Sequence, residues 1–125
     1  MRINNSHIKT CFDLAKTSTV RRGKVGAILI KDGGGIVCKS TNMNIYGHSK
    51  KFSIHAEEYI IKKAEKMKLF TRFPKEKFSL LVVRWRPLTN KLGNAMPCIN
   101  CQKILDNYNL NVYFSNYNGE IKQYK

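Results

Sequence analysis

The chain has 125 residues, which is enough for one domain with its own hydrophobic core and too few for two. Its longest apolar runs, at 25–30 and 80–83, are far shorter than the roughly 20 residues of a membrane-crossing helix, and its N-terminus is polar rather than signal-like. We therefore expect one domain over residues 1–125 in a soluble intracellular protein, cytoplasmic or nuclear, with no membrane partner.

Positive charge dominates the chain. Lys and Arg number 23 against 8 acidic residues, which gives a formal net charge of +15. A field of this sign attracts polyanions at long range, so single-stranded nucleic acid is an expected partner. The alternative is that an AT-rich genome enriches the protein in Lys, Asn, Ile and Tyr through codon composition alone.

The hydrophobic pattern predicts alternating helices and strands. The expected elements are, in chain order, a helix over 6–18, strands over 24–31 and 36–41, a loop over 42–51, a helix over 54–68, a linker over 70–77, a strand over 78–85, a loop over 88–96, a helix over 98–107, and strands over 112–115 and 120–125. Ser53 is the expected N-cap of the second helix, and Pro87 ends the strongest candidate for a central strand. This order implies an α/β fold with a mixed sheet of about five strands and helices on its faces.

Two short motifs at expected helix starts contain the residue types of a metal site. His-Ala-Glu occupies residues 55–57, and Pro-Cys-Ile-Asn-Cys occupies residues 97–101. A catalytic zinc takes three protein ligands and keeps a fourth position for water, and His55, Cys98 and Cys101 meet this count. Helix starts suit the two cysteines, because unpaired N–H groups and the helix dipole lower the pKa of a thiol there.

Glu57 is the expected proton carrier. It lies two residues after His55, roughly 200° around a helix, so both can face one site only if the tip of the helix points at it. First-turn side chains lean toward the N-terminus, which lets Glu57 reach an attacking water without binding the metal. It would act first as a general base and then as a general acid.

Two other interpretations of the cysteine pair stay open. A Cys-x-x-Cys pair also marks thioredoxin-like redox sites. A closed structural zinc would need a fourth ligand, for which Cys11, Cys38 and His48 are candidates, and it would leave Glu57 unexplained. The simplest role for Cys11 and Cys38 is that of small core residues.

The spacing H-x-E followed by P-C-x-x-C is the signature of zinc deaminases of nucleobases, and the chain closely resembles the cytidine deaminase-like superfamily. The resemblance extends over most of the chain, including Val-Gly-Ala at 25–27, the Asp-Gly hairpin and Val-Tyr-Phe-Ser at 112–115. It implies a three-layer α-β-α fold, Zn²⁺ as the cofactor, and hydrolysis of the C–N bond that turns cytosine into uracil. Glu57 would then pass its proton to the ring nitrogen and the departing ammonia.

The same resemblance implies a set of substrate contacts. The backbone N–H groups of Ala56 and Cys98 would bind the pyrimidine edge, and the Pro97 carbonyl would accept from the exocyclic amine. Asn42 would contact the sugar, with Asn44 as the alternative. Relatives often assemble so that neighbours wall the pocket, which makes a homo-oligomer an expectation from resemblance.

Arg84, Trp85 and Arg86 are further candidates for substrate binding, because an aromatic ring between guanidinium groups can stack a base and hold phosphates. Alternation along a strand, however, would send Trp85 to the face opposite both arginines. Burial is the commoner fate of a tryptophan in a strand.

The end of the chain separates branches of the superfamily. Only about four residues lie between the last two strands, and a parallel crossover needs a dozen or more, so we expect an antiparallel C-terminal hairpin as in free-cytidine deaminases. Those enzymes usually bind zinc through three cysteines, whereas His55 stands here, as in the nucleotide and nucleic-acid branches. We expect a cytidine or deoxycytidine moiety as substrate, with single-stranded DNA or RNA ahead of the free nucleoside or nucleotide. Adenine, and a catalytically silent zinc protein that binds nucleic acid, are the alternatives.

Overall fold

The helices and strands of the protein come from a computed structural model that describes residues 3–20, 23–47 and 50–125, with the backbone alone for 44–47 and 50–53. The elements are, in chain order, α1 (Asn5–Lys16), β1 (Lys24–Ile30), β2 (Ile36–Thr41), β3 (Met43–Gly47), β4 (Lys50–Ile54), α2 (Ala56–Lys66), α3 (Leu69–Arg72), β5 (Phe78–Arg86), β6 (Lys91–Gly93), α4 (Ile99–Leu105), β7 (Leu110–Ser115) and β8 (Ile121–Gln123). None of the helices in these ranges combines the length and the apolar character that a bilayer crossing requires.

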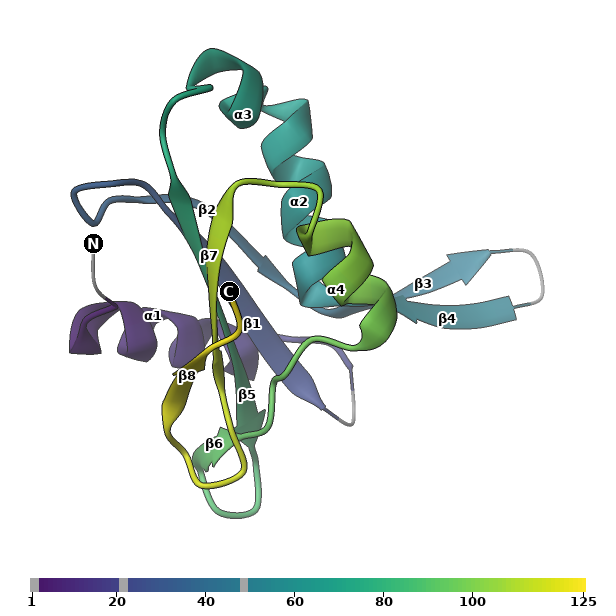
Figure 1. Cartoon of the computed structure of the whole chain (residues 1–125). Helices are drawn as coiled ribbons and strands as arrows, with labels where there is room; N and C mark the ends of the chain where they lie inside the picture. Colours follow the sequence, from purple (N-terminus) through teal and green to yellow (C-terminus); the bar gives the residue numbers. More distant parts are fainter. Residues whose placement is uncertain (1–2, 21–22, 48–49) are drawn as a thin grey trace.

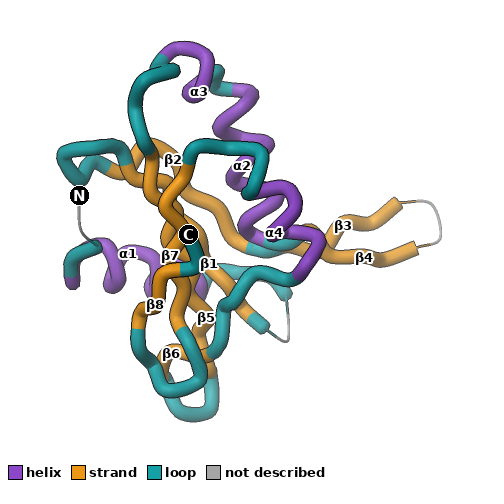
Figure 2. The backbone as a smooth tube through the Cα atoms, in the orientation of Figure 1, coloured by secondary structure: helices purple, strands orange, loops and turns teal. Residues whose placement is uncertain are grey.

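The main sheet is mixed, as predicted. Its strands run in the order β2-β1-β5-β7-β8, and β6 adds to the end of β5 (Figures 1 and 2). β5 pairs antiparallel with β1 and parallel with β7, while β7 pairs antiparallel with β8. The central place of β5 and the antiparallel C-terminal hairpin are therefore confirmed.

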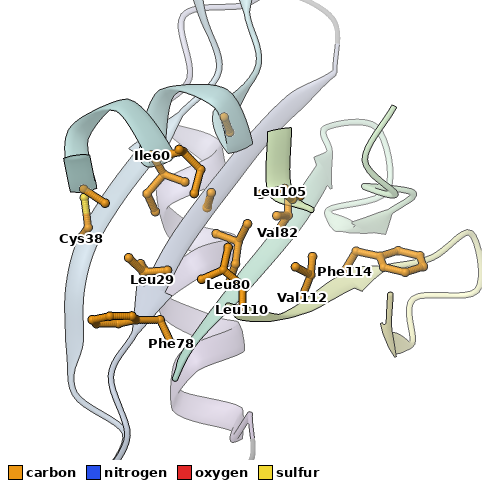
Figure 3. Packing of buried hydrophobic residues seen from close by; sticks show 14 of the residues in the cluster. Leu29, Cys38, Ile60, Phe78, Leu80, Val82, Leu105, Leu110, Val112 and Phe114 are labelled. Atoms are coloured by element: carbon orange, nitrogen blue, oxygen red, sulfur yellow. The ribbon is translucent and has the colours of Figure 1, made fainter. Parts of the chain in front are cut away.

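Helices cover both faces of this sheet and make the expected three layers. α1 packs on β1 and β5 from one side, whereas α2 packs on β2 and β1 from the other (Figure 1). Alternation along β5 divides the core accordingly: Leu80 and Val82 belong to the cluster with Ile60 of α2, shown in Figure 3, and Leu81 and Val83 belong to the cluster on the α1 side. The same alternation determines toward which face of the sheet each side chain at the end of β5 points.

Residues 42–51, expected to be a loop, are instead mostly a hairpin of β3 and β4 that projects from the body of the protein (Figure 1). The two strands pair with each other as a separate sheet. A ribbon outside the main sheet has no core face to impose an apolar alternation, which explains why the sequence pattern missed it. Ser53 consequently lies in β4, and His55 takes the N-cap position of α2.

Two smaller differences concern short elements. The expected linker at 70–77 overlaps α3, and the expected loop at 88–96 contains β6. Each has four residues or fewer, too short to show a hydrophobic period.

Gly26 allows α1 to lie directly against β1. A Cβ atom at this position would lie 2.6 Å from the carbonyl oxygen of Cys11 and 2.8 Å from the backbone nitrogen of Ala15. Both are backbone atoms, so the helix would have to shift. We expect Gly26→Ala to lower the free energy of unfolding by about 1–3 kcal/mol, measured by urea denaturation.

Gly35 offers the matched control, because a Cβ there would meet no heavy atom within 4 Å. Gly35→Ala should change the free energy of unfolding by less than about 0.5 kcal/mol. Equal effects of the two substitutions would contradict the close approach of α1 to β1.

Candidate metal centre and active site

The N-terminal ends of α2 and α4 carry the two sequence motifs, and the two helices contact each other (Figure 1). His55 is the N-cap of α2 and Cys98 is the N-cap of α4, with Cys101 one turn further. Ser40 of β2 donates a hydrogen bond of 2.8 Å to the carbonyl oxygen of Ala56, which ties the start of α2 to the sheet. The fold therefore brings together residues that are more than 40 positions apart in the chain.

His55, Cys98 and Cys101 form one group of potential metal ligands. The Nδ1 atom of His55 lies 3.3 Å from the Sγ atom of Cys101 and 3.6 Å from that of Cys98, and all three atoms lie within 4.8 Å of one another. Tetrahedral Zn²⁺, with bonds of about 2.0–2.1 Å to nitrogen and 2.3 Å to sulfur, places such ligand atoms about 3.5 Å apart. These distances and the donor types fit zinc.

Glu57 is buried, with 6 % of its surface exposed, and its carboxyl group contacts the Cys101 thiol. Burial raises the pKa of Glu57 above its usual range. Burial also raises the pKa of the Cys101 thiol, and the neighbouring Glu57 carboxylate raises it further. At Cys101 these two effects on the thiol pKa outweigh the decrease that we expected from its place at a helix start. A dication bound here would offset both costs, because its charge stabilises the thiolate and the carboxylate together.

A cavity of about 270 Å³ opens onto this group. Its lining residues include His55, Ala56, Glu57 and Cys98. The other residues that line it come from the segment after α1, from β1, from the residue after β2, from the end of β5 and from the segment before α4: Val20, Gly23, Val25, Asn42, Arg84, Asn94, Ala95 and Met96. Glu57, His55 and Cys98 thus face one common space that a small ligand can enter.

Asn42 lines this cavity, but its side chain is largely occupied by structural hydrogen bonds. Its Oδ1 atom accepts from the backbone N–H of Val25 at 3.0 Å and from the hydroxyl of Ser18 at 2.7 Å. Its Nδ2 atom donates to the carbonyl oxygen of Gly23 at 2.6 Å. One N–H of the amide is left for a ligand. The Asn44 side chain, the alternative sugar contact, lies outside the described residues.

The three residues at the end of β5 separate as strand alternation predicts. Arg84 lines the cavity, whereas Trp85 continues the α1 side of the strand, is half-buried, and donates from Nε1 to the Oδ1 atom of Asn90 at 2.9 Å. Arg86 lies on the same face as Arg84 and lines a neighbouring cavity. Pro97 is buried and is not among the residues that line the catalytic cavity, and its carbonyl oxygen accepts from Gln102 Nε2 at 2.8 Å.

Comparison with known proteins decides the family. The family model described as the cytidine and deoxycytidylate deaminase zinc-binding region matches residues 1–123. The chain belongs to this family. No curated protein matches the chain.

Solved structures of related deaminases have the same fold as this family member. The dCMP deaminase of the cyanophage S-TIM5 in apo form is 24% identical, with a TM-score of 0.64 over 90% of this chain and 81% of that one. The same enzyme in complex with dCMP and dUMP is 21% identical, with a TM-score of 0.66 over 93% and 85%. Cytidine deaminase from Burkholderia pseudomallei is 18% identical, with a TM-score of 0.67 over 98% and 91%.

Because the chain belongs to a zinc-binding deaminase family, the cysteine pair is interpreted as part of a metal site and not as a redox pair. Two candidates for a fourth ligand lie elsewhere: Cys11 is buried, with its thiol donating to the Gly26 carbonyl oxygen at 3.2 Å, and Cys38 is in the core beside α2. His48, the third candidate, lies outside the described residues. Cys11 and Cys38 are core residues, as predicted.

Sequence reasoning missed some of the residues that shape the cavity of this deaminase family member. Val20 and Gly23 lie in a segment that Asn42 contacts through the hydroxyl of Ser18 and the carbonyl oxygen of Gly23. No local signal in the sequence marks them. Asn94 and Met96, in contrast, stand just before the Pro-Cys motif, and that position could have suggested them.

Proposed function

We propose that the protein is a zinc-dependent hydrolytic deaminase that converts cytosine to uracil in a cytidine or deoxycytidine moiety. The observation that carries this proposal is the placement of buried Glu57 in one cavity with His55 and Cys98, beside Cys101. Water supplies the new oxygen at C4 of the ring, and the exocyclic amine leaves as ammonia.

Metal binding and proton transfer are assigned to different residues of the chain. Zn²⁺ held by His55, Cys98 and Cys101 would lower the pKa of a water molecule and so supply hydroxide near neutral pH. Glu57 takes up the proton released by that water and holds it on a carboxyl oxygen. It delivers this proton to the ring nitrogen N3 as the C4–O bond forms. It then takes the second proton from the new hydroxyl on C4 and passes it to the exocyclic amine, which leaves as ammonia as the C4–N bond breaks.

We assign the orientation of the base to backbone groups around the candidate metal centre. Ala56 and Cys98 line the cavity at the starts of α2 and α4, where backbone N–H groups lack partners within the helix. We assign the pyrimidine edge to these N–H groups and the exocyclic amine to the second lone pair of the Pro97 carbonyl oxygen. The remaining N–H of Asn42 would donate to the sugar.

Charge supports single-stranded nucleic acid as the first substrate to test. The net charge of +15 favours a polyanion. A duplex is disfavoured, because the target base would have to leave the stack at a cost of a few kcal/mol. The complex of the cyanophage enzyme with dCMP and dUMP supports the free nucleotide as the second. A single catalytic domain over residues 1–125 and assembly into a homo-oligomer stay predictions.

A substrate panel tests the proposal. The zinc-loaded protein is offered cytidine, deoxycytidine, dCMP, and single-stranded DNA and RNA oligonucleotides, and uracil formation is followed by chromatography. Uracil from at least one substrate, and none with Glu57→Ala, is the expected result. Binding without product in both proteins would instead establish the catalytically silent alternative.

A further inference from the structure

We propose that Arg84 and Arg86 form a phosphate-binding site beside the catalytic cavity, so that the substrate is a nucleotide unit and not a free nucleoside. This inference rests on the proposed function, since it names a second part of the same substrate. It assigns to the two arginines the role of specificity-determining residues.

The two guanidinium groups lie on the active-site face of the sheet. Arg84 and Arg86 continue the alternation of Leu80 and Val82, which face α2. Both side chains pass over Gly93 of β6: a Cβ atom on this glycine would lie 2.8 Å from Cγ of Arg86 and 3.4 Å from Cδ of Arg84. The missing side chain at Gly93 therefore lets the two arginines lie side by side.

Neither arginine side chain has an acidic partner in the described part of the chain, where the ion pairs involve lysines only. Both side chains are exposed, and the described residues offer their guanidinium groups no hydrogen bond. Two neighbouring cations without a counter-ion repel each other, and a bound anion removes that cost. Guanidinium groups also match phosphate oxygens in geometry, because they can donate two parallel hydrogen bonds.

A second cavity, of about 200 Å³, places this pair next to the metal centre. It is lined by Arg84, Arg86, Gly93, Asn94 and Tyr117. Arg84 and Asn94 also line the catalytic cavity, so the two spaces adjoin along these residues. A nucleotide has the same layout, with its phosphate separated from the base by the sugar alone.

Ser115 holds the end of β5, which carries Arg84 and Arg86, in a fixed position relative to the active site. This fully buried residue accepts from the backbone N–H of Arg84 at 3.2 Å and donates to the carbonyl oxygen of Gly93 at 2.6 Å. Its own carbonyl oxygen accepts from the backbone N–H of Ala95 at 2.8 Å. One side chain and its backbone thus connect β5, β6 and the segment that leads to Cys98, which preorganises the site.

The test compares ligands that differ only in phosphate. Binding of dCMP and of deoxycytidine to the zinc-loaded Glu57→Gln protein, which prevents turnover, is measured by calorimetry with and without Arg84→Gln. We expect Arg84→Gln to reduce the preference for dCMP over deoxycytidine by about 10- to 100-fold, the effect of losing a charged hydrogen-bond donor. Arg84→Lys should restore part of it. Arg86→Gln should act in the same direction, and Arg72→Gln, on α3, is the control that should leave the preference unchanged.

A single-stranded oligonucleotide with one cytosine, titrated in parallel, distinguishes the source of the phosphate. If Arg84→Gln lowers the affinity for dCMP more than the affinity for the oligonucleotide, the site binds a phosphomonoester. If it lowers the affinity for the oligonucleotide more, the site binds a phosphodiester. Each result supports the inference. An unchanged preference in folded Arg84→Gln and Arg86→Gln proteins, verified by thermal denaturation, would overturn it. The proposed function is judged separately, by whether the native protein forms uracil from any substrate.

Discussion

Replacing Glu57 with Gln is expected to reduce kcat for cytosine deamination by about 10²- to 10⁴-fold while the protein keeps its zinc. Gln has nearly the same shape as Glu but cannot take a proton from water or deliver one to the ring. Glu57 is not among the ligand atoms of the candidate centre, so the metal site should survive the change. Steady-state kinetics and zinc analysis of the same preparation measure both effects.

Glu58 supplies the matched control, because it is the adjacent acid on the same helix. Its carboxylate lies 3.7 Å from the ammonium group of Lys62 on the exterior of α2. Such an exposed pair contributes little, so Glu58→Gln should leave kcat within about twofold of the native value. Substantial activity in Glu57→Gln, or an equal loss in Glu58→Gln, would contradict the role assigned to Glu57.

Replacing Cys101 with Ser is expected to lower zinc affinity by more than about 100-fold and to abolish deamination. Loss of an outer partner of a ligand already costs about 10- to 100-fold in affinity, and loss of a ligand should cost more. The buried thiol is next to Glu57, so the variant would also lack the charge balance that a thiolate and zinc provide together. Titration with a competing chelator measures the affinity.

Cys38→Ser is the control for this change. Cys38 is also buried, but it lies in the core against α2 and apart from the metal-ligand group. The Cys38→Ser substitution should lower the free energy of unfolding without changing the zinc content. Equal zinc loss in the two variants would mean that unfolding, and not ligand removal, explains the result at Cys101.

The sequence was sufficient to predict which potential metal ligands the fold brings together, because their chemistry is local to two motifs. The Pro-Cys motif opens α4 and the His-Ala-Glu motif opens α2, each within two residues of the expected start. The place of β5 at the centre of the sheet followed from its continuous apolar run, and the antiparallel pairing of β8 followed from the short turn before it.

What the sequence could not predict depends on contacts between distant segments. The hairpin of β3 and β4 has no apolar period to reveal it, and Ser53 looked like a helix cap because the strand that contains it was not visible. Asn42 was assigned to the sugar, and its three hydrogen bonds within the fold could not be inferred from its position in the chain. Which of the two arginines on β5 reaches the catalytic cavity likewise depends on the fold.

X-ray absorption at the zinc edge tests the metal centre most directly. For the zinc-loaded native protein we expect about two sulfur neighbours at about 2.3 Å, together with one imidazole nitrogen and one further light atom at about 2.0–2.1 Å. That shell would correspond to His55, Cys98, Cys101 and a solvent ligand in the position that catalysis needs. Four protein ligands, such as three sulfur atoms with one imidazole or two sulfur atoms with two imidazoles, would leave no place for the solvent ligand; that shell would mean a closed structural site and would contradict the proposed deaminase.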